Sequence, residues 1–453
     1  MNLCLHISIK YFTFANRNKN SIFFMNNFVK TSYKLLNVNS GSLFEDNGWM
    51  LDDPNGASAS LIRAIYERKQ IRFRDDLDGI YRFADWLPIS RTLKGSSAPV
   101  TFKSDKLAKY LGLNNLYITF NGYFPEVGAN MTTCSFKETE AYSVCGRLSE
   151  NEDRVLVVSS AGNTARAFAK VCSENNIKLL LCVPADNLDA LWFDKPINDC
   201  VKLVSTECGS DYFDSINIGN IAVKCSKFVS EGGAKNIARR DGMSTTVLSA
   251  VEKIGAIPDY YFQAVGSGTG AIAAWEANLR FNEDGRFGQK NMKLMVSQNY
   301  PFAPMYNAWQ ADSRAMLPYD DDQARKDASV IKAKVLSNRK PPYSICGGLY
   351  DALKSTDGQC FSCTNEESEV AMKIFEDCEG VDIYHASGIA TASLFKAVEN
   401  GMVDKDKIVM LNITGGGERR FKADRDLFYL EPSKVFKIND SEECIIDFVN
   451  SLF

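Results

Sequence analysis

Residues 155–172 read VLVVSSAGNTARAFAKVC: four apolar residues, a turn of small polar residues and an amphipathic stretch. Four consecutive apolar residues are typical of a strand that is buried on both faces. The pattern recurs along the chain. Apolar runs lie at 177–183, 201–204, 261–265, 292–296 and 408–413, and helical patterns lie at 165–172, 216–228 and 271–280. Such strands, separated by helices, predict a parallel sheet covered on both faces, so the fold class is α/β.

The composition limits the possible partners. The 453 residues are too many for one ordinary core and favour several domains or a two-lobed enzyme. With 52 basic and 56 acidic residues the net charge is −4, which gives no positive field for nucleic acid or an anionic membrane. No apolar run approaches the ~18 residues that a membrane span needs. Neither nucleic acid nor a membrane is therefore an expected partner.

The thirteen cysteines are an odd number and mostly lie in apolar runs, as buried free thiols do. This usage predicts a cytoplasmic protein. Cys360 and Cys363 have the spacing of metal ligands, but no second pair accompanies them, and His6 and His385 are the only histidines. No metal site is expected, and a zinc site is the minor alternative.

Residues 1–80 are expected to form an extension before the catalytic body. Residues 1–24 mix apolar and basic residues without the core of a secretion signal. Met25 is an alternative start, in which case residues 1–24 are not translated. Residues 37–59 are rich in Asn, Asp, Gly and Ser and are interpreted as a linker.

Lys137 is the candidate catalytic residue. It lies in Ser135-Phe136-Lys137-Glu138, at the point where small polar residues give way to a helical pattern. Burial and the positive end of a helix dipole both disfavour an ammonium ion, so a nucleophilic amine becomes accessible near neutral pH.

A glycine-rich turn, Gly266-Ser267-Gly268-Thr269-Gly270, lies between the apolar run at 261–265 and the helical pattern at 271–280. Glycines let the backbone N–H groups approach a phosphate closely, and the two hydroxyls add donors. The glycine spacing does not match the full dinucleotide pattern GxGxxG. A reactive lysine together with a phosphate loop is what an enzyme that uses pyridoxal 5′-phosphate requires.

A second polar turn, Ser159-Ser160-Ala161-Gly162-Asn163-Thr164, also follows an apolar run and opens a helical pattern. Its N–H groups and hydroxyls suit an anion such as an amino-acid carboxylate. The amide of Asn163 is a candidate donor to a phenolic oxygen of the cofactor. A capped turn without a ligand is the alternative.

These motifs and a later one, Asn412-Ile413-Thr414-Gly415-Gly416-Gly417, occur in an order that resembles fold type II pyridoxal phosphate enzymes, the threonine synthase and cysteine synthase group. Within this group, the stretches at 120–126, 228–236, 261–265 and 338–343 are most similar to those of the cysteate synthases. The resemblance covers about residues 83–417.

The resemblance implies a tryptophan synthase β-like fold of two three-layer α/β domains, with the cofactor between them. Its large cofactor-binding domain would comprise residues 81–150 and 255–453, and its small substrate-binding domain residues 151–254. Enzymes of this fold are commonly dimers, so a homo-oligomer is expected.

The resemblance also assigns roles. Lys137 would form the imine with the cofactor, Asn163 would pair with its 3′ oxygen, and Thr414 would face its ring nitrogen. The cofactor phosphate would bind at Gly266, Ser267, Gly268, Thr269 and Gly270. The substrate carboxylate would bind at Ser160, Ala161, Gly162 and Thr164, and the substrate phosphate at Asn236 and Arg239.

Some residues depart from threonine synthases. Glu138 and Thr139 stand where those enzymes usually have Asp-Arg after the lysine, and Ser244 replaces an expected lysine. The chain also has no cysteine-rich leading segment of the kind found in archaeal cysteate synthases. Both a coenzyme M pathway and a bacterial sulfonolipid pathway are therefore considered.

The implied reaction converts O-phospho-L-serine and sulfite to L-cysteate and phosphate by β-replacement, with Lys137 removing the α-proton. A hydroxyl at the ring nitrogen favours this chemistry over transamination. The basic candidates for binding phosphate and sulfite are Lys235, Arg239, Arg240, Arg339 and Lys340, with Arg239 preferred. Threonine synthase or cysteine synthase activity is the first alternative, and a catalytically silent cofactor-binding scaffold is the second.

Overall fold

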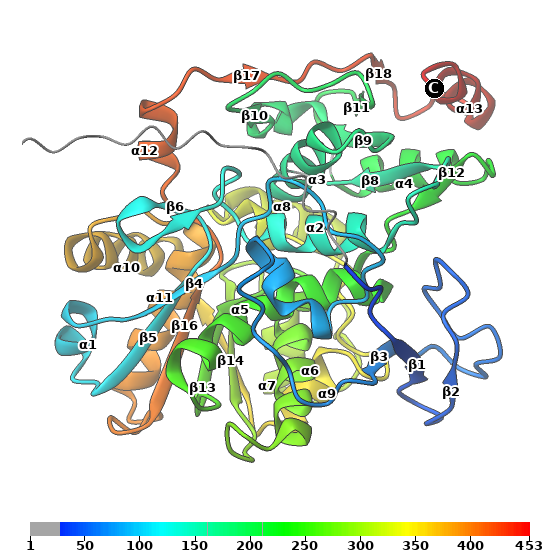
Figure 1. Cartoon of the computed structure of the whole chain (residues 1–453). Helices are drawn as coiled ribbons and strands as arrows, with labels where there is room; N and C mark the ends of the chain where they lie inside the picture. Colours follow the sequence, from blue (N-terminus) through cyan, green and yellow to red (C-terminus); the bar gives the residue numbers. More distant parts are fainter. Residues whose placement is uncertain (1–27, 161, 211) are drawn as a thin grey trace, which may run out of the picture.

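The computed structural model describes residues 28–160, 162–210 and 212–453, which form two lobes, each built on a parallel sheet (Figure 1). Met25 and residues 1–24, where the alternative start was considered, lie outside the described residues. Among the described helices, none combines the length and the apolar character that crossing a bilayer requires.

The larger lobe contains a six-stranded sheet in the order β15-β14-β13-β16-β5-β4. All neighbouring strands are parallel except β4 and β5. The strands are β4 (Val100–Lys103), β5 (Asn115–Phe120), β13 (Tyr260–Ala264), β14 (Lys293–Asn299), β15 (Gln359–Cys363) and β16 (Ile408–Ile413).

Helices cover both faces of this sheet, as its apolar strands require. Successive residues of a strand point to opposite faces, so Tyr261 packs in one core and Phe262 in the other. Cys360 and Cys363 of β15 also lie in these two separate cores, so the pair does not converge on one metal ion. The helices of this lobe are α1 (Lys106–Leu111), α5 (Ile237–Ile254), α6 (Thr269–Asp284), α7 (Pro304–Gln310), α8 (Asp321–Val330), α9 (Leu349–Ser355), α10 (Asn365–Glu379) and α11 (His385–Glu399).

The smaller lobe contains a five-stranded, fully parallel sheet in the order β12-β8-β9-β11-β18. Helices α2 and α3 pack on one face, and α4 and α13 pack on the other. The elements are β8 (Val155–Ser159), β9 (Leu179–Pro184), β11 (Val201–Thr206), β12 (Phe228–Ser230), β18 (Lys434–Phe436), α2 (Lys137–Arg147), α3 (Asn163–Glu174), α4 (Tyr212–Ala222) and α13 (Glu442–Ser451).

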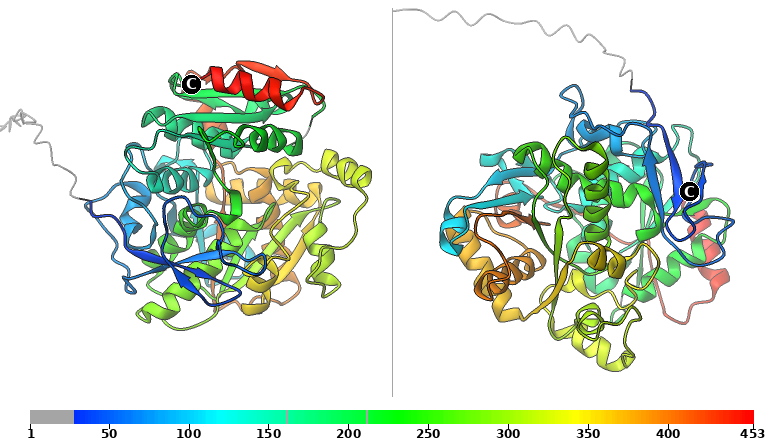
Figure 2. Two further views of the ribbon diagram at one scale, coloured as in Figure 1. Left: turned by 90° about the vertical axis from the view of Figure 1, so that its right-hand side faces the viewer. Right: turned by 90° about the horizontal axis from the view of Figure 1, so that it is seen from below.

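The lobes differ from the domain division drawn from the sequence at two helices and at the end of the chain. The division placed α2 in the large domain and α5 in the small one, whereas α2 packs on the small sheet and α5 in the core of the large lobe. That division placed all of residues 255–453 in the large domain, but β18 extends the small sheet and α13 covers it (Figure 2). The helical pattern expected through residue 228 is also wrong at its end. Helix α4 ends at Ala222, and Phe228 begins strand β12, which pairs with β8.

Residues 28–80 pack against the large lobe and contain an antiparallel sheet of β1 (Tyr33–Asn37), β2 (Leu43–Phe44) and β3 (Ile62–Tyr66). The apolar face of β3 joins the core beneath α5 and α6. A buried ion pair reinforces the contact: Arg63 of β3 bonds Glu276 of α6 at 3.3 Å. Arg240 of α5 also bonds Glu276, at 3.0 Å, and donates to the Ile62 carbonyl oxygen of β3. The part of the extension that is described is therefore built into the body of the protein.

Short elements complete the fold. They are β6 (Tyr123–Phe124), β7 (Ala129–Asn130), β10 (Trp192–Phe193), β17 (Phe428–Tyr429), α12 (Glu418–Ala423) and the 3₁₀ segments Gly79–Trp86, Pro125–Val127, Ala185–Ala190, Gly233–Lys235 and Lys334–Leu336.

Candidate functional site

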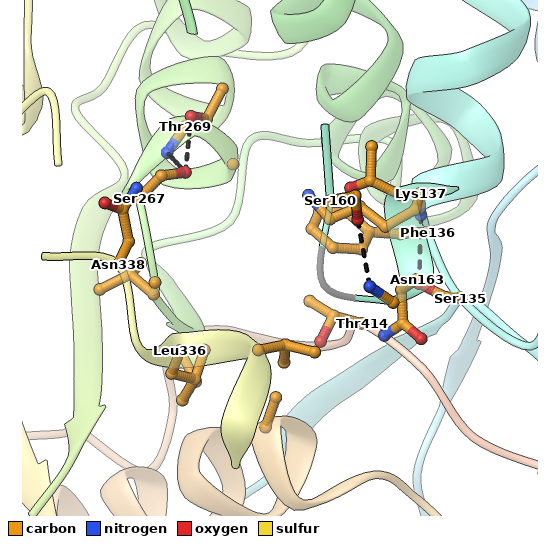
Figure 3. Close-up of a pocket in the computed structure, with 18 of the residues that line it drawn as sticks. Ser135, Phe136, Lys137, Ser160, Asn163, Ser267, Thr269, Leu336, Asn338 and Thr414 are labelled. Atoms are coloured by element: carbon orange, nitrogen blue, oxygen red, sulfur yellow. Dashed lines mark hydrogen bonds between the residues drawn. The ribbon is translucent and has the colours of Figure 1, made fainter. Parts of the chain in front are cut away.

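One pocket brings most of the candidate residues together, at the carboxyl ends of β8, β13 and β16 (Figure 3). Parallel strands direct the loops that follow them to one edge of a sheet, which is where ligands bind in α/β folds. Ser267 and Thr269 lie on one side of the pocket, and Lys137, Ser160 and Asn163 lie on the other. The candidates that line it are Lys137, Ser160, Gly162, Asn163, Thr164, Arg239, Gly266, Ser267, Gly268, Thr269, Gly270 and Thr414.

Lys137 is the first residue of α2, as the sequence predicted. Its side chain is 21% exposed, and its Nζ donates to Oε2 of Glu140 at 3.1 Å. Burial lowers the pKa of Lys137 below its ordinary value, although the Glu140 carboxylate opposes the shift. The helix dipole acts in the same direction as burial. The amine is therefore more readily deprotonated than that of a surface lysine.

The glycine turn forms the start of α6, which begins at Thr269 with Gly268 as its N-cap. The first N–H groups of a helix have no intrahelical acceptor, and they carry the positive end of the dipole. A Cβ on Gly266 would lie 2.7 Å from the Val335 carbonyl oxygen, and one on Gly270 would lie 2.5 Å from Nε2 of Gln263. At Gly266 the obstacle is backbone, so only glycine fits there, whereas a Cβ at Gly270 would require the Gln263 amide to shift.

Asn163, the first residue of α3, is oriented by Arg166 one turn later. The guanidinium donates to Oδ1 of Asn163 at 2.9 Å, to the Tyr384 hydroxyl at 3.0 Å and to the Thr133 carbonyl oxygen. It also stacks on Trp192, 4.0 Å from the ring centroid. Because arginine only donates, the atom that faces it must be the amide oxygen. The NH₂ group of Asn163 remains available to an acceptor in the pocket.

Thr414 follows β16 and lines the same pocket. Its hydroxyl lies 3.4 Å from that of Ser387, which also accepts from the Gly415 N–H. The neighbouring titratable side chain at this end of the pocket is Tyr384, whose pKa burial raises well above its ordinary value. The group that Thr414 offers to a ligand at this position is therefore a neutral hydroxyl and not a carboxylate.

Arg239 enters the pocket from α5 and is 15% exposed. It donates to both oxygens of Glu140, at 3.2 and 2.9 Å, and to Oε2 of Glu231 at 2.7 Å. Burial by itself would lower the pKa of Arg239, but these two carboxylates raise it, so the side chain is a permanent cation. Such a cation is suited to an oxyanion.

The hydroxyls of Ser160 and Thr164, in the turn at 160–164, already form hydrogen bonds within the protein. Ser160 Oγ accepts from the N–H groups of Gly162 and Ala165, at 3.2 and 3.1 Å, and keeps its own hydrogen for another acceptor. The Thr164 hydroxyl donates to Oε1 of Glu140 at 3.1 Å. Ala161 lies outside the described residues.

Asn236 is not brought into the pocket, contrary to the role that the resemblance assigned to it. It is fully buried and is the N-cap of α5: its side chain accepts from the Ala238 N–H at 3.0 Å and from Arg147 at 2.9 Å. It also donates to the Glu231 carbonyl oxygen at 2.7 Å. Its position, directly before a helix, is the sequence signal for such a cap.

The other four basic candidates also lie outside the pocket lining, and of these Arg339 and Lys340 lie against the Phe213 ring. Arg240 is fully buried and bonds Glu276, and Lys235 pairs with Asp52 at 2.7 Å on the surface. The pocket instead contains side chains that sequence reasoning did not single out: Tyr212, Gln263, Tyr384 and residues 334–338. Behind it lies Glu140, which also went unnoticed, although it is placed one helical turn after Lys137.

The pocket fits pyridoxal 5′-phosphate. An amine with lowered pKa is available for the aldehyde, and a glycine loop at a helix start is available for the phosphate. The oriented amide of Asn163 can donate to the ring oxygen, and the neutral hydroxyl of Thr414 suits the ring nitrogen. Within the glycine loop the Ser267 hydroxyl accepts from the Thr269 N–H at 3.3 Å and lies 2.7 Å from the Thr269 hydroxyl.

Comparison with known sequences extends these observations. A model of the family described as pyridoxal-phosphate dependent enzymes matches residues 102–415. The chain is 48% identical to the cysteate synthase of Methanosarcina barkeri over 84% of this chain and 92% of that protein. It is 49% identical to the cysteate synthase of Methanosarcina mazei over 82% of this chain and 90% of that protein.

Solved structures match at the level of the fold. Maize serine racemase superposes with a TM-score of 0.54 and 12% identity, covering 70% of this chain and 88% of its own. Threonine deaminase isoform 2 of Solanum lycopersicum gives a TM-score of 0.50 and 17% identity, covering 72% and 88%. At these identities the likeness concerns the fold alone.

Proposed function

The chain belongs to the family of pyridoxal-phosphate dependent enzymes, and on that premise we propose that it converts O-phospho-L-serine and sulfite to L-cysteate and phosphate. The observation that carries the proposal is the 48% identity with a cysteate synthase along 92% of that protein. The expected fold type II architecture and the dependence on pyridoxal phosphate are confirmed. The substrates and the roles of individual residues are proposals.

Pyridoxal phosphate, when bound, supplies an electron sink that makes the Cα hydrogen of an amino acid acidic and allows a group on Cβ to leave. The residues of the pocket would hold it in a defined orientation. Residues 266–270 would bind its phosphate, the NH₂ group of Asn163 its ring oxygen, and the hydroxyl of Thr414 its ring nitrogen. Lys137 would hold its aldehyde.

The other residues would bind and orient the substrate. Ser160 and Thr164 would hold its carboxylate at the start of α3, where the dipole favours an anion. Lys137 would take the Cα proton at Nζ. Arg239 would bind the phosphate that leaves and then the sulfite that replaces it, because both are oxyanions of similar size.

We expect a cytoplasmic enzyme that acts as a homo-oligomer. The twelve cysteines in the described part of the chain are all free thiols, which supports a reducing compartment. L-cysteate would serve coenzyme M or sulfonolipid synthesis.

The test is product analysis. Purified enzyme loaded with pyridoxal phosphate is incubated with O-phospho-L-serine and sulfite, and the product is identified by mass spectrometry. L-cysteate should form, at a rate well above that of cysteine from sulfide or of threonine from O-phosphohomoserine. Omission of sulfite is the control and should yield no cysteate. Preferential formation of cysteine or threonine would replace this proposal with the first alternative, and inertness toward every substrate would favour the scaffold.

A further inference from the structure

Glu140 joins Lys137 and Arg239, two of the basic residues that line the pocket, through one carboxylate. Its Oε2 accepts from Lys137 Nζ at 3.1 Å and from Arg239 Nε at 3.2 Å. Its Oε1 accepts from Arg239 Nη2 at 2.9 Å and from Thr164 Oγ1 at 3.1 Å. The side chain of Glu140 is 0% exposed. A buried carboxylate with four donors is held in one place, and two of its partners belong to the proposed substrate site.

The charged groups around Glu140 show which cations its carboxylate neutralises. Lys137 and Glu140 lie on α2, Arg239 lies on α5, Glu231 follows β12, and Tyr212 begins α4. Burial raises the pKa of the Tyr212 hydroxyl, so it stays neutral near pH 7, and α3 contributes only the uncharged Thr164 on this side. Two carboxylates therefore face one permanent cation, Arg239, and one titratable cation, Lys137.

Glu231 bonds Arg239 through one of its two oxygens. Its Oε2 accepts from that guanidinium and from the Gly233 N–H, and its Oε1 has no partner among the described residues. Glu140 is the carboxylate that contacts Lys137 directly. The charge of Glu140 therefore favours the ammonium form of Lys137, against the effect of burial.

We propose that Glu140 is a positioning residue that receives the ammonium of Lys137 whenever its amine is not bonded to the cofactor, and that it links this state to Arg239 and Thr164. The inference rests on the proposed role of Lys137. When Lys137 removes the substrate proton, the Cα–H bond breaks, its electron pair stays on the substrate, and the proton arrives on Nζ. Glu140 is then in place to stabilise the new cation. Glu140 then shares its charge between Lys137 and Arg239 without moving, which weakens its attraction for the guanidinium that would bind the departing phosphate.

The direct test is the substitution Glu140→Gln, which keeps the shape and removes the charge. In protein freed of cofactor, the appearance of the absorbance band of lysine-bound pyridoxal phosphate is followed as a function of pH. Only the neutral amine captures the aldehyde. Because the carboxylate no longer stabilises the ammonium, capture near pH 7 should be roughly tenfold faster or more, and its pH midpoint should fall. The value of kcat should drop by about tenfold or more, since the proton on Nζ loses its counter-ion.

Two further variants make the result specific. Glu138→Gln is the matched control: Glu138 is a buried glutamate on the same helix, but its partners are Thr133 and Lys170. It should leave the capture midpoint unchanged. Glu140→Asp keeps the charge and should restore a midpoint close to that of the wild type. If Glu140→Gln does not fold, Glu140→Met, which also removes the charge at similar length, takes its place and should lower the midpoint in the same way.

The outcomes separate this inference from the proposed function. If Lys137→Ala still shows the band of lysine-bound cofactor, the role of Lys137 is wrong. If Lys137→Ala abolishes the band but Glu140→Gln captures the cofactor with the midpoint of the wild type, the inference about Glu140 is wrong and the role of Lys137 stands. An equal shift of the capture midpoint in Glu138→Gln would also overturn the inference about Glu140, because loss of any buried negative charge on α2 would then have the same effect.

Discussion

Lys137→Ala is expected to lower kcat/KM for cysteate formation by at least ~10⁴-fold and to remove the absorbance band of lysine-bound pyridoxal phosphate. The reason is that one amine serves as both the attachment point of the cofactor and the base that takes the Cα proton. Both properties depend on its place at the start of α2, where burial lowers its pKa. Steady-state assays and an absorbance spectrum measure the two effects.

Lys137→Arg is the companion variant. It keeps a cation opposite Glu140, so the buried carboxylate retains a partner and the fold should be preserved. A guanidinium neither forms the imine nor accepts a proton near pH 7. Activity should be lost here as completely as in the alanine variant. Substantial turnover by either protein would show that another residue performs the chemistry.

Gly268→Val is expected to weaken cofactor binding by about 100-fold or more. Gly268 has φ of +80°, which a β-branched residue strongly disfavours, and its Cβ would lie 2.9 Å from a methyl carbon of Leu349. To relieve the backbone strain and the contact with Leu349, the turn would have to move. Its N–H groups would then no longer converge on a phosphate. The dissociation constant of pyridoxal phosphate, measured by titration, reports the change.

Gly255→Val provides the control for backbone strain. Gly255 has a similar φ, +78°, at the C-cap of α5, and a Cβ added there would have no atom within 4 Å. The substitution should reduce stability through the same unfavourable conformation and leave cofactor affinity unchanged. Equal affinity losses in the two variants would mean that the glycine turn has no specific role in holding the phosphate.

The sheets could be predicted because their strands are continuous apolar runs. Residues 408–413 coincide with β16, and residues 155–158 and 261–265 match β8 and β13 within one residue at each end. The end of α4 could not be predicted, because residues 223–227 contain no glycine or proline to mark a stop, and only the pairing of β12 with β8 shows where the strand begins. The place of β18 in the small sheet is likewise a long-range contact, with β11, that no local pattern contains.

The site could be predicted where its residues are consecutive. The loops at 160–164 and 266–270 and the lysine at 137 are local motifs, and the fold brings them to one pocket. Glu140 and Arg166 could not be identified from the sequence because the residues they bond are distant in the chain. Glu140 bonds Arg239, and Arg166 bonds Tyr384. Asn236 was assigned to the substrate because the whole segment around it resembles a phosphate-binding segment of threonine synthases. In the structure its side chain instead caps α5.

Borohydride reduction of the enzyme loaded with pyridoxal phosphate, followed by peptide mapping, tests the central claim most directly. Reduction makes the bond between lysine and cofactor permanent, and mass spectrometry then identifies the modified residue. A single pyridoxyl adduct should be found on the peptide that contains Lys137. An adduct on another lysine, or none, would contradict the account.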